Sequence, residues 1–337
     1  MLRTKNSVHR SIGLGLAAAG LLLAACGGSS SGTSPSAASG VTTQASIASE
    51  VPASIKGTVV QFATDATYAP NEYINPDTGQ IQGWDIDLAN AICKVMGLVC
   101  TANNVTFDDI IAQLKASTPA EQAGGDKPRY QFSISSWTPT AKREMSGIDF
   151  VSYFQAGEAW VAKAGGPKIS TAADMCGHKV AVETGTVEES DAWGFMGKMV
   201  GGTPISADTD HCAGHDMTVD SYVTQTQADA ALRSGRDDIG FLDRPVAEYE
   251  VKVTGGKFGA GALLVNSQPC GVAPYGIAMV QNAPLEKPIE DAVKYLMDNG
   301  FYTQILKSWN VQAGALTSSQ VTVNNNNQVG GVCVPSY

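Results

Sequence analysis

The sequence SISSWTPTAKR, residues 133–143, contains the end of one predicted strand and the start of a predicted helix. Apolar and polar residues alternate up to Ile134, which is the pattern of a half-buried strand. Thr138 is a favourable N-cap residue and Pro139 suits the first helical position, so we expect a helix to begin here. Such a strand followed by a helix is typical of a sheet covered by helices.

The same stretch also carries groups that suit a bound carboxylate. The first turn of a helix leaves backbone N–H groups unpaired and bears partial positive charge. Ser136 and Thr138 add hydroxyl donors, and Arg143 follows closely enough for its guanidinium to fold back toward them. Arginine can bind a carboxylate through two hydrogen bonds at once. The alternative is an ordinary strand–loop–helix corner with Arg143 on the surface.

The chain on either side continues the alternation of strands and helices. Strands are predicted at 58–62, 99–105, 177–182, 238–242 and 275–280, with helices between them and two closing helices separated by Gly300. This pattern predicts two α/β units, with polar loops at the carboxyl ends of their strands. We expect the chain to cross between the units near Phe154–Gly157 and Gly276–Met279.

The first residues predict export. A basic segment is followed by an apolar run at about 12–23, which is too short for a permanent membrane span and is typical of a secretory signal. Cys26 follows small residues, as in a bacterial lipobox, so it is expected to carry lipid after cleavage. An ordinary signal peptide with a coincidental Cys26 is the alternative. The Ser- and Gly-rich run that follows predicts a flexible tether.

These features predict the organisation of the whole chain. We expect a signal peptide at 1–25, a lipidated flexible tether at 26–54, a first lobe of 55–155 plus 279–315, a second lobe of 156–278, and a tail at 316–337. The formal net charge of −10 argues against nucleic acid as a partner. No basic face for anionic lipid is expected either.

Six cysteines besides Cys26 suggest disulfides in an exported chain, although no pairing follows from sequence alone. We expect them to pair in sequence order, as Cys93–Cys100, Cys176–Cys212 and Cys270–Cys333. Free buried thiols are the alternative. His211-Cys212 with His215 is an alternative metal site, but no metal is expected, because Cys212 is better used in a disulfide.

Three motifs carry a resemblance to a known family: DATYAP at 65–70, GWDIDLA at 83–89, and SSWT at 135–138 with Arg143. With them, residues 55–312 resemble the bacterial extracellular solute-binding proteins of family 3, the receptors of polar amino-acid importers. The resemblance implies a type II periplasmic binding-protein-like fold, in which two α/β lobes joined by two crossing strands close on a free amino acid. It also implies a membrane partner, the permease of an ABC importer, and we expect a lipid-anchored monomer at the outer face of the cell membrane.

The resemblance and the residue chemistry together assign roles to eight ligand-binding residues. The ligand carboxylate is expected to lie against donors from both lobes, namely Ser136, Thr138, Arg143 and Thr186. Asp243 is expected to accept the ligand ammonium, with a simple strand-end carboxylate as the alternative. Tyr68 and Phe107 would cover the apolar stem, and core packing is the alternative for Phe107. Asp65 would face the ligand side chain and favour a cationic or amide group over an acidic one.

Two other functions are compatible with the fold. An exported dehydratase or lyase would need a general acid or base beside its substrate. However, His178, His211 and His215 lie away from the predicted pocket loops, and no nucleophile elbow, P-loop or dinucleotide motif is present. A ligand-sensing module for a partner receptor is the other alternative. We therefore expect a binding protein that is no enzyme and uses no cofactor.

Overall fold

The computed structural model describes residues 40–116, 129–205 and 210–324. The predicted signal peptide and the lipidation site Cys26 lie outside these residues, as does Cys333. Within the described ranges, no helix is both long enough and apolar enough to span a bilayer.

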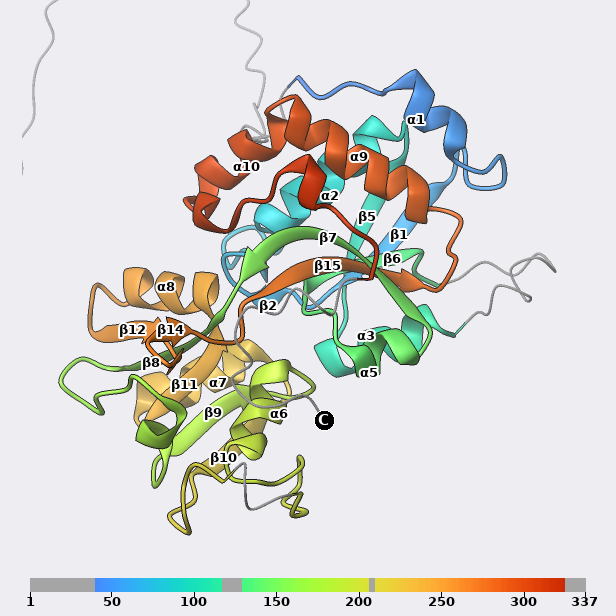
Figure 1. Ribbon diagram of the computed structural model, residues 1–337. Helices are drawn as coiled ribbons and strands as arrows, with labels where there is room; N and C mark the ends of the chain where they lie inside the picture. Colours follow the sequence, from blue (N-terminus) through green and yellow to red (C-terminus); the bar gives the residue numbers. More distant parts are fainter. Residues whose placement is uncertain (1–39, 117–128, 206–209, 325–337) are drawn as a thin grey trace, which may run out of the picture. The chain divides into compact units, whose positions relative to one another are not determined.

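The first sheet has five strands in the order β5-β1-β6-β15-β7 (Figure 1). β1 is parallel to β5 and β6, whereas β15 is antiparallel to β6 and β7. The strands span β1 (Val59–Thr64), β5 (Val99–Asn104), β6 (Phe132–Trp137), β7 (Ile148–Ala156) and β15 (Ala273–Val280). Because the carboxyl ends of β1 and β6 lie at one end of the sheet, the loops that follow them meet there.

Helices cover both faces of this sheet, because successive strand residues point to opposite faces. Phe62 of β1 packs in one core and its neighbour Ala63 in the other. The larger core includes α2 (Trp84–Val95), α9 (Glu286–Asp298) and α10 (Phe301–Trp309), and the smaller one includes α3 (Phe107–Leu114).

The second sheet also has five strands, in the order β10-β9-β11-β8-β12. Its strands span β8 (Glu158–Lys163), β9 (Lys179–Glu183), β10 (Thr218–Tyr222), β11 (Ile239–Asp243) and β12 (Phe258–Ala262), and its helices span α6 (Val187–Gly194), α7 (Gln225–Ser234) and α8 (Arg244–Val253). β9 is parallel to β10 and β11, while β8 is antiparallel to β11 and β12. The two predicted α/β units are therefore present, each with its own sheet.

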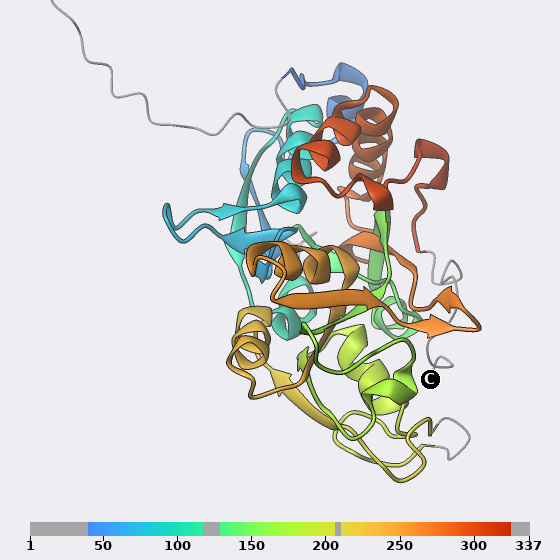
Figure 2. The same cartoon turned by 90° about the vertical axis from the view of Figure 1, so that its left-hand side faces the viewer.

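Two smaller β structures were not predicted. One combines β2 (Thr67–Tyr68), β3 (Glu72–Ile74) and β4 (Ile81–Gln82), and the other combines β13 (Leu264–Val265) and β14 (Gln268–Pro269). Figure 2 shows the β3–β4 and β13–β14 hairpins projecting in opposite directions. The β2 strand brings Tyr68 to the cavity described below.

The chain passes between the sheets at Gly157, which separates β7 from β8, within the first predicted crossing. The second crossing lies earlier than predicted. β15 pairs with β7 from Ala273 onward, so Gly276–Met279 lie inside the first sheet. An apolar strand sequence does not reveal which of two sheets it enters. Residues of the first sheet therefore occur before the predicted boundary at residue 279.

The predicted tether and the predicted tail both contain more folded structure than expected. In the 26–54 segment, α1 (Ala45–Glu50) buries Ile47 and is flanked by the buried residues Val41 and Val51, all within the larger core. In the 316–337 tail, the residues up to Asn324 lie along β7. The Ser152 amide donates to the Thr322 carbonyl at 3.0 Å, and Val151 and Val323 form a bridge. Isolated apolar residues in polar surroundings gave too weak a pattern for these segments to be predicted.

The helix after β6 starts later than predicted. The short helix α5 (Ala141–Met145) is capped by Thr140, whose hydroxyl accepts from the Arg143 amide at 3.2 Å. Thr138 is therefore not the N-cap, and Pro139 precedes the helix. Both Thr138 and Thr140 had suitable side chains, and only the backbone conformation distinguishes them.

Two predicted disulfides are present, Cys93–Cys100 and Cys176–Cys212. They close loops with sequence separations of 7 and 36 residues. The bond to Cys212 leaves no thiolate for the alternative metal site with His211 and His215. The third predicted pair, Cys270–Cys333, includes a residue outside the described part of the chain and stays a prediction.

The two disulfides are expected to contribute unequally to stability. A cross-link that closes a longer loop removes more conformational entropy from the unfolded chain. Replacing Cys176 and Cys212 together with serine should therefore lower the free energy of unfolding by about 1.5 kcal/mol more than replacing Cys93 and Cys100. Urea denaturation of the two double variants measures this difference. An equal loss in both would contradict the loop-length argument.

Candidate functional site

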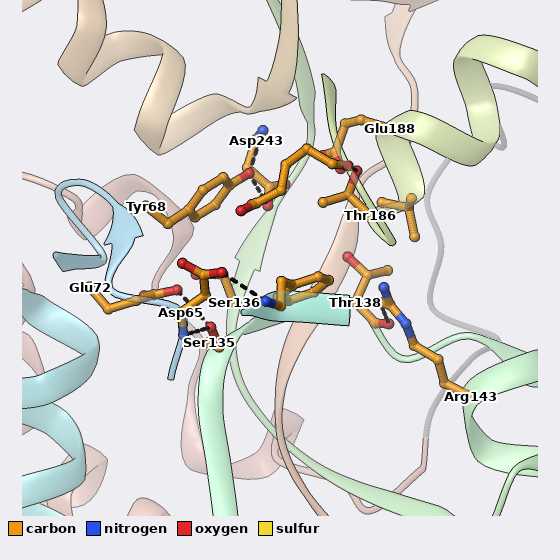
Figure 3. Close-up of a pocket in the computed structure, with 13 residues that line it drawn as sticks. Asp65, Tyr68, Glu72, Ser135, Ser136, Thr138, Arg143, Thr186, Glu188 and Asp243 are labelled. Carbon is orange, nitrogen blue, oxygen red and sulfur yellow. Dashed lines mark hydrogen bonds between the residues drawn. The ribbon is translucent and has the colours of Figure 1, made fainter. Parts of the chain in front are cut away.

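One cavity gathers polar side chains from both sheets and encloses about 320 Å³, open solvent included. The lining residues are Asp65, Tyr68, Glu72, Phe107, Ser135, Ser136, Thr138, Arg143, Glu183, Thr186, Val187, Glu188 and Asp243. All eight residues predicted from the sequence are among them. Figure 3 shows Thr186, Glu188 and Asp243 facing Ser136, Thr138 and Arg143 across the cavity.

Arg143 is held by carbonyl groups from both sides of the cavity. Its Nη1 donates to the Thr138 carbonyl at 2.7 Å and its Nη2 to the Gly185 carbonyl at 2.9 Å. The guanidinium carbon lies 4.8 Å from the centroid of the Trp137 ring and 5.5 Å from that of Phe107. Burial lowers the pKa of Arg143 to about 10, so the side chain is still charged at neutral pH.

Two aromatic residues support that guanidinium. The rings of Phe107 and Trp137 stack with centroids 4.1 Å apart. Phe107 lines the cavity, whereas Trp137 lies beside it and donates from its indole N–H to Ser133 at 2.9 Å. A guanidinium above aromatic faces is attracted by their π electrons, which fixes its position. Trp137 therefore orients Arg143 without lining the cavity.

A buried polar network positions Ser136. This residue has a φ of 52°, which is unusual for a residue with a side chain. Its hydroxyl accepts from the side-chain amide of Asn71 at 2.8 Å, and its backbone N–H donates to the carboxylate of Asp85 at 3.2 Å. Tyr153 donates to the same Asp85 oxygen at 2.7 Å. Burial raises the pKa of Asp85 to about 7. The network holds Ser136 at the cavity wall.

Asp243 ends β11 and contacts Tyr68 across the cavity. The Tyr68 hydroxyl donates to Asp243 Oδ2 at 3.1 Å and accepts from the Asp243 amide at 3.0 Å. Burial raises the pKa of Asp243 to about 6, although the hydrogen bond from Tyr68 and the charge of Arg143 oppose this increase. The carboxylate therefore lies in a dry, hydrogen-bonded position where it can accept a cation.

Two further carboxyl groups, one from each sheet, meet near Thr67. The Thr67 hydroxyl lies 2.7 Å from Asp65 Oδ1 and 3.5 Å from Glu183 Oε1. Asp65 also accepts from the backbone N–H of Phe107 at 2.7 Å, and Glu183 accepts from the backbone N–H of Gln225 at 2.9 Å. Burial raises the pKa of both carboxyl groups, and the charge of Asp65 raises that of Glu183 further.

Five lining residues were not predicted from the sequence, namely Glu72, Ser135, Glu183, Val187 and Glu188. Three of them are acidic, so the cavity is lined by five carboxyl groups and one guanidinium. Glu183 ends a strand and Glu188 follows the N-cap Thr186, where acidic residues are common for structural reasons. No simple pattern distinguishes such residues from capping ones. None of the residues that line the cavity is a histidine.

Comparisons with known proteins identify the family of this chain. The family described as bacterial extracellular solute-binding proteins, family 3, matches residues 60–312. Arginine-binding protein ArgT of Corynebacterium glutamicum is 26% identical over 263 residues, which cover 78% of each chain.

Solved structures give the same result. The arginine-, lysine-, histidine-binding protein ArtJ of Geobacillus stearothermophilus superposes with a TM-score of 0.60 at 27% identity, covering 75% of this chain and 95% of that one. The ancestral amino acid-binding protein AncCDT-1, a precursor of cyclohexadienyl dehydratase, superposes with a TM-score of 0.59 at 25% identity, covering 74% and 95%. These similarities confirm the predicted type II periplasmic binding-protein-like fold.

Proposed function

The chain belongs to the bacterial extracellular solute-binding proteins of family 3, and from this membership we propose that its cavity captures one polar amino acid for delivery to an ABC importer. The observation that carries the proposal is the presence of Arg143 and Asp243 in one cavity built from both sheets. A free amino acid carries a carboxylate and an ammonium group, and these two side chains complement them.

The carboxylate end of the ligand is assigned to Arg143 and its neighbours. The guanidinium is fixed by the Thr138 and Gly185 carbonyls, which leaves its remaining N–H groups to donate to a ligand. Ser136 and Thr138 offer hydroxyl groups on one side, and Thr186 begins α6 on the other. Charge-assisted hydrogen bonds to a carboxylate are among the strongest available in such a site.

The side-chain end of the ligand is assigned to Asp65 and Glu183. Two carboxyl groups in a low-dielectric cavity repel each other unless a proton or a cation lies between them. A cationic side chain would neutralise this pair, an amide would do so less well, and an acidic side chain would be rejected. The arginine-binding protein ArgT and the arginine-, lysine-, histidine-binding protein ArtJ support a basic ligand.

Contacts from both sheets explain how an importer would distinguish the ligand-bound protein from the free one. A ligand that bridges Arg143 and Asp243 stabilises the state in which the two lobes are closed, and a closed shape is what an importer can recognise. A lipid at Cys26 would anchor the monomer at the outer face of the membrane and raise its concentration near the importer.

An exported dehydratase is the second candidate, because AncCDT-1 is described as a precursor of such an enzyme. Binding without chemistry is favoured by the similarity to ArgT and ArtJ, which are named as binding proteins, whereas the carboxyl groups of the cavity could serve either function. Mass spectrometry of an amino acid incubated with the purified protein separates the two functions. Chemical conversion of the ligand would establish the enzyme. A role in sensing is separated from import by uptake measurements in cells that lack the protein.

A thermal-shift screen of the twenty amino acids tests the proposed function. A ligand that binds only the folded chain stabilises it by about 2.7 kcal/mol at a concentration a hundred times its Kd. For a domain of this size, that corresponds to an increase of roughly 5–10 °C in the melting temperature. Arginine and lysine should give the largest increases, glutamine a smaller one and glutamate none. No increase with any amino acid would refute the proposal.

A further inference from the structure

Glu188 is a buried carboxyl group that the roles assigned above leave unexplained. It lies in the first turn of α6, lines the cavity and is 2% exposed. Its Oε1 has no hydrogen-bond partner among the residues that the structure describes. An unpaired buried carboxylate oxygen costs free energy. A polar group of the bound ligand would satisfy this oxygen and so explain why an acidic residue lies here.

The position of Glu188 indicates which part of the ligand it would meet. Figure 3 shows its side chain on the same side of the cavity as Asp243, and the charge of Asp243 acts directly on Glu188. Two buried carboxylates on one side of a low-dielectric cavity repel each other, which favours protonation of one of the pair. Asp243 is the group assigned to the ligand ammonium, and Glu188 therefore lies beside the amine end.

The surroundings favour Glu188 as the holder of that proton. Burial raises the pKa of Glu188 well above its usual value, and the charge of Asp243 raises it further. Arg143 is the one positive group that opposes this among the charges acting on Glu188. The charged and titratable groups that interact with it come from six elements and are Asp243, Asp191, Arg143, Tyr68, Glu158 and Tyr275.

We propose that Glu188 holds a proton in the empty cavity, and that this proton leaves when the ammonium group of the ligand binds between Glu188 and Asp243. The proposal rests on the proposed function and adds a second anionic contact to its amine-binding end. The ligand ammonium keeps all its hydrogens, no covalent bond of the ligand changes, and the carboxyl proton passes to the solvent. The ligand carboxylate meanwhile pairs with Arg143.

A dependence of affinity on pH follows from this exchange. A proton that must leave on binding competes with the ligand, so the association constant rises with pH, by up to about tenfold per pH unit. The increase ends once Glu188 is already ionised in the empty cavity. Affinity is thus lost as the medium becomes acidic, and the ligand binds most tightly under neutral to alkaline conditions.

Calorimetry of L-arginine and L-glutamine binding tests the exchange. Titrations in buffers of different ionisation enthalpy count the protons released, and about one per bound L-glutamine is expected. Protein variants are compared with this neutral probe, since the cationic side chain of L-arginine would also displace a proton from the Asp65 and Glu183 pair. Glu188→Gln has no carboxyl proton to release, so proton release should disappear and the pH dependence should flatten. At about pH 8 the variant should bind about tenfold more weakly or worse, since a buried charge-assisted hydrogen bond is lost.

Glu189→Gln is the matched control. Glu189 is the next residue on α6 and is also buried, but it lies outside the cavity lining and accepts from the Gly185 amide and the Ser221 hydroxyl. This variant should release the same proton as the unchanged protein. Proton release that persists in Glu188→Gln, or binding without release in the unchanged protein, overturns the role of Glu188. Failure of both probes and of every other amino acid to bind would instead refute the proposed function, and the exchange with it.

Discussion

Replacing Arg143 with alanine is expected to weaken amino-acid binding by about 10²- to 10⁴-fold. Among the described residues that line the cavity, the guanidinium is the one positive group beside five carboxyl groups, so its loss leaves the ligand carboxylate facing negative charge. Each charge-assisted hydrogen bond to the carboxylate contributes about 1.5–3 kcal/mol, and two such bonds are available. Calorimetry with L-arginine at neutral pH measures the change in Kd.

Two further variants serve as controls for that result. Arg143→Lys keeps a charge but cannot bind a carboxylate through two parallel N–H groups, so it should recover only part of the affinity. Arg236→Ala removes an exposed arginine that stacks on Tyr222, outside the cavity lining, and should leave the Kd unchanged. Equal affinities for the Arg143→Ala variant and the unchanged protein would remove Arg143 from the binding site.

Replacing Trp84 with alanine is expected to lower the free energy of unfolding by about 3–5 kcal/mol. The side chain is fully buried and packs against Phe154, with ring centroids 4.6 Å apart. Its indole N–H donates to Asn71 at 2.6 Å, and Asn71 in turn donates to Ser136. The substitution therefore creates a cavity and also releases a support of the binding site. Urea denaturation measures the first effect and the Kd for L-arginine the second.

Trp309 offers a matched control for that substitution. It is only partly buried and donates from its indole N–H to Asp87 at 2.8 Å. Less of its apolar surface leaves water on folding, so Trp309→Ala should cost less than Trp84→Ala and should leave ligand affinity intact. A loss of stability in Trp309→Ala that matches or exceeds that in Trp84→Ala would contradict this ranking.

Much of the cavity could be predicted because its residues lie in recognisable local patterns. Asp65 and Asp243 follow predicted strands, and Arg143 lies just past a strand end, so the parallel arrangement of strands brings such positions together. Glu183 and Glu188 could not be assigned in this way. Acidic residues are frequent at strand ends and helix starts for reasons unrelated to ligands, and only the packing of the two sheets shows that these face the cavity.

Backbone pairing between distant segments was the other part that could not be predicted. The second crossing was expected within Gly276–Met279, but these residues pair with β7 inside the first sheet. A run of apolar residues fits either sheet equally well, and its partner is decided by long-range packing. The same limit applies to Val41 and Ile47, which reach the larger core from a segment of otherwise polar composition.

The residues beyond the family match have a consequence for solubility. β7 is the last strand of the first sheet, and without a neighbour its outward N–H and C=O groups would form an exposed edge open to strands of other molecules. The chain from Ala315 to Asn324 covers this edge, and the backbone N–H of Asn324 donates to the Phe150 carbonyl at 3.0 Å. The C-terminal extension thus protects the receptor from aggregating through its own sheet, a task separate from anything the ligand requires.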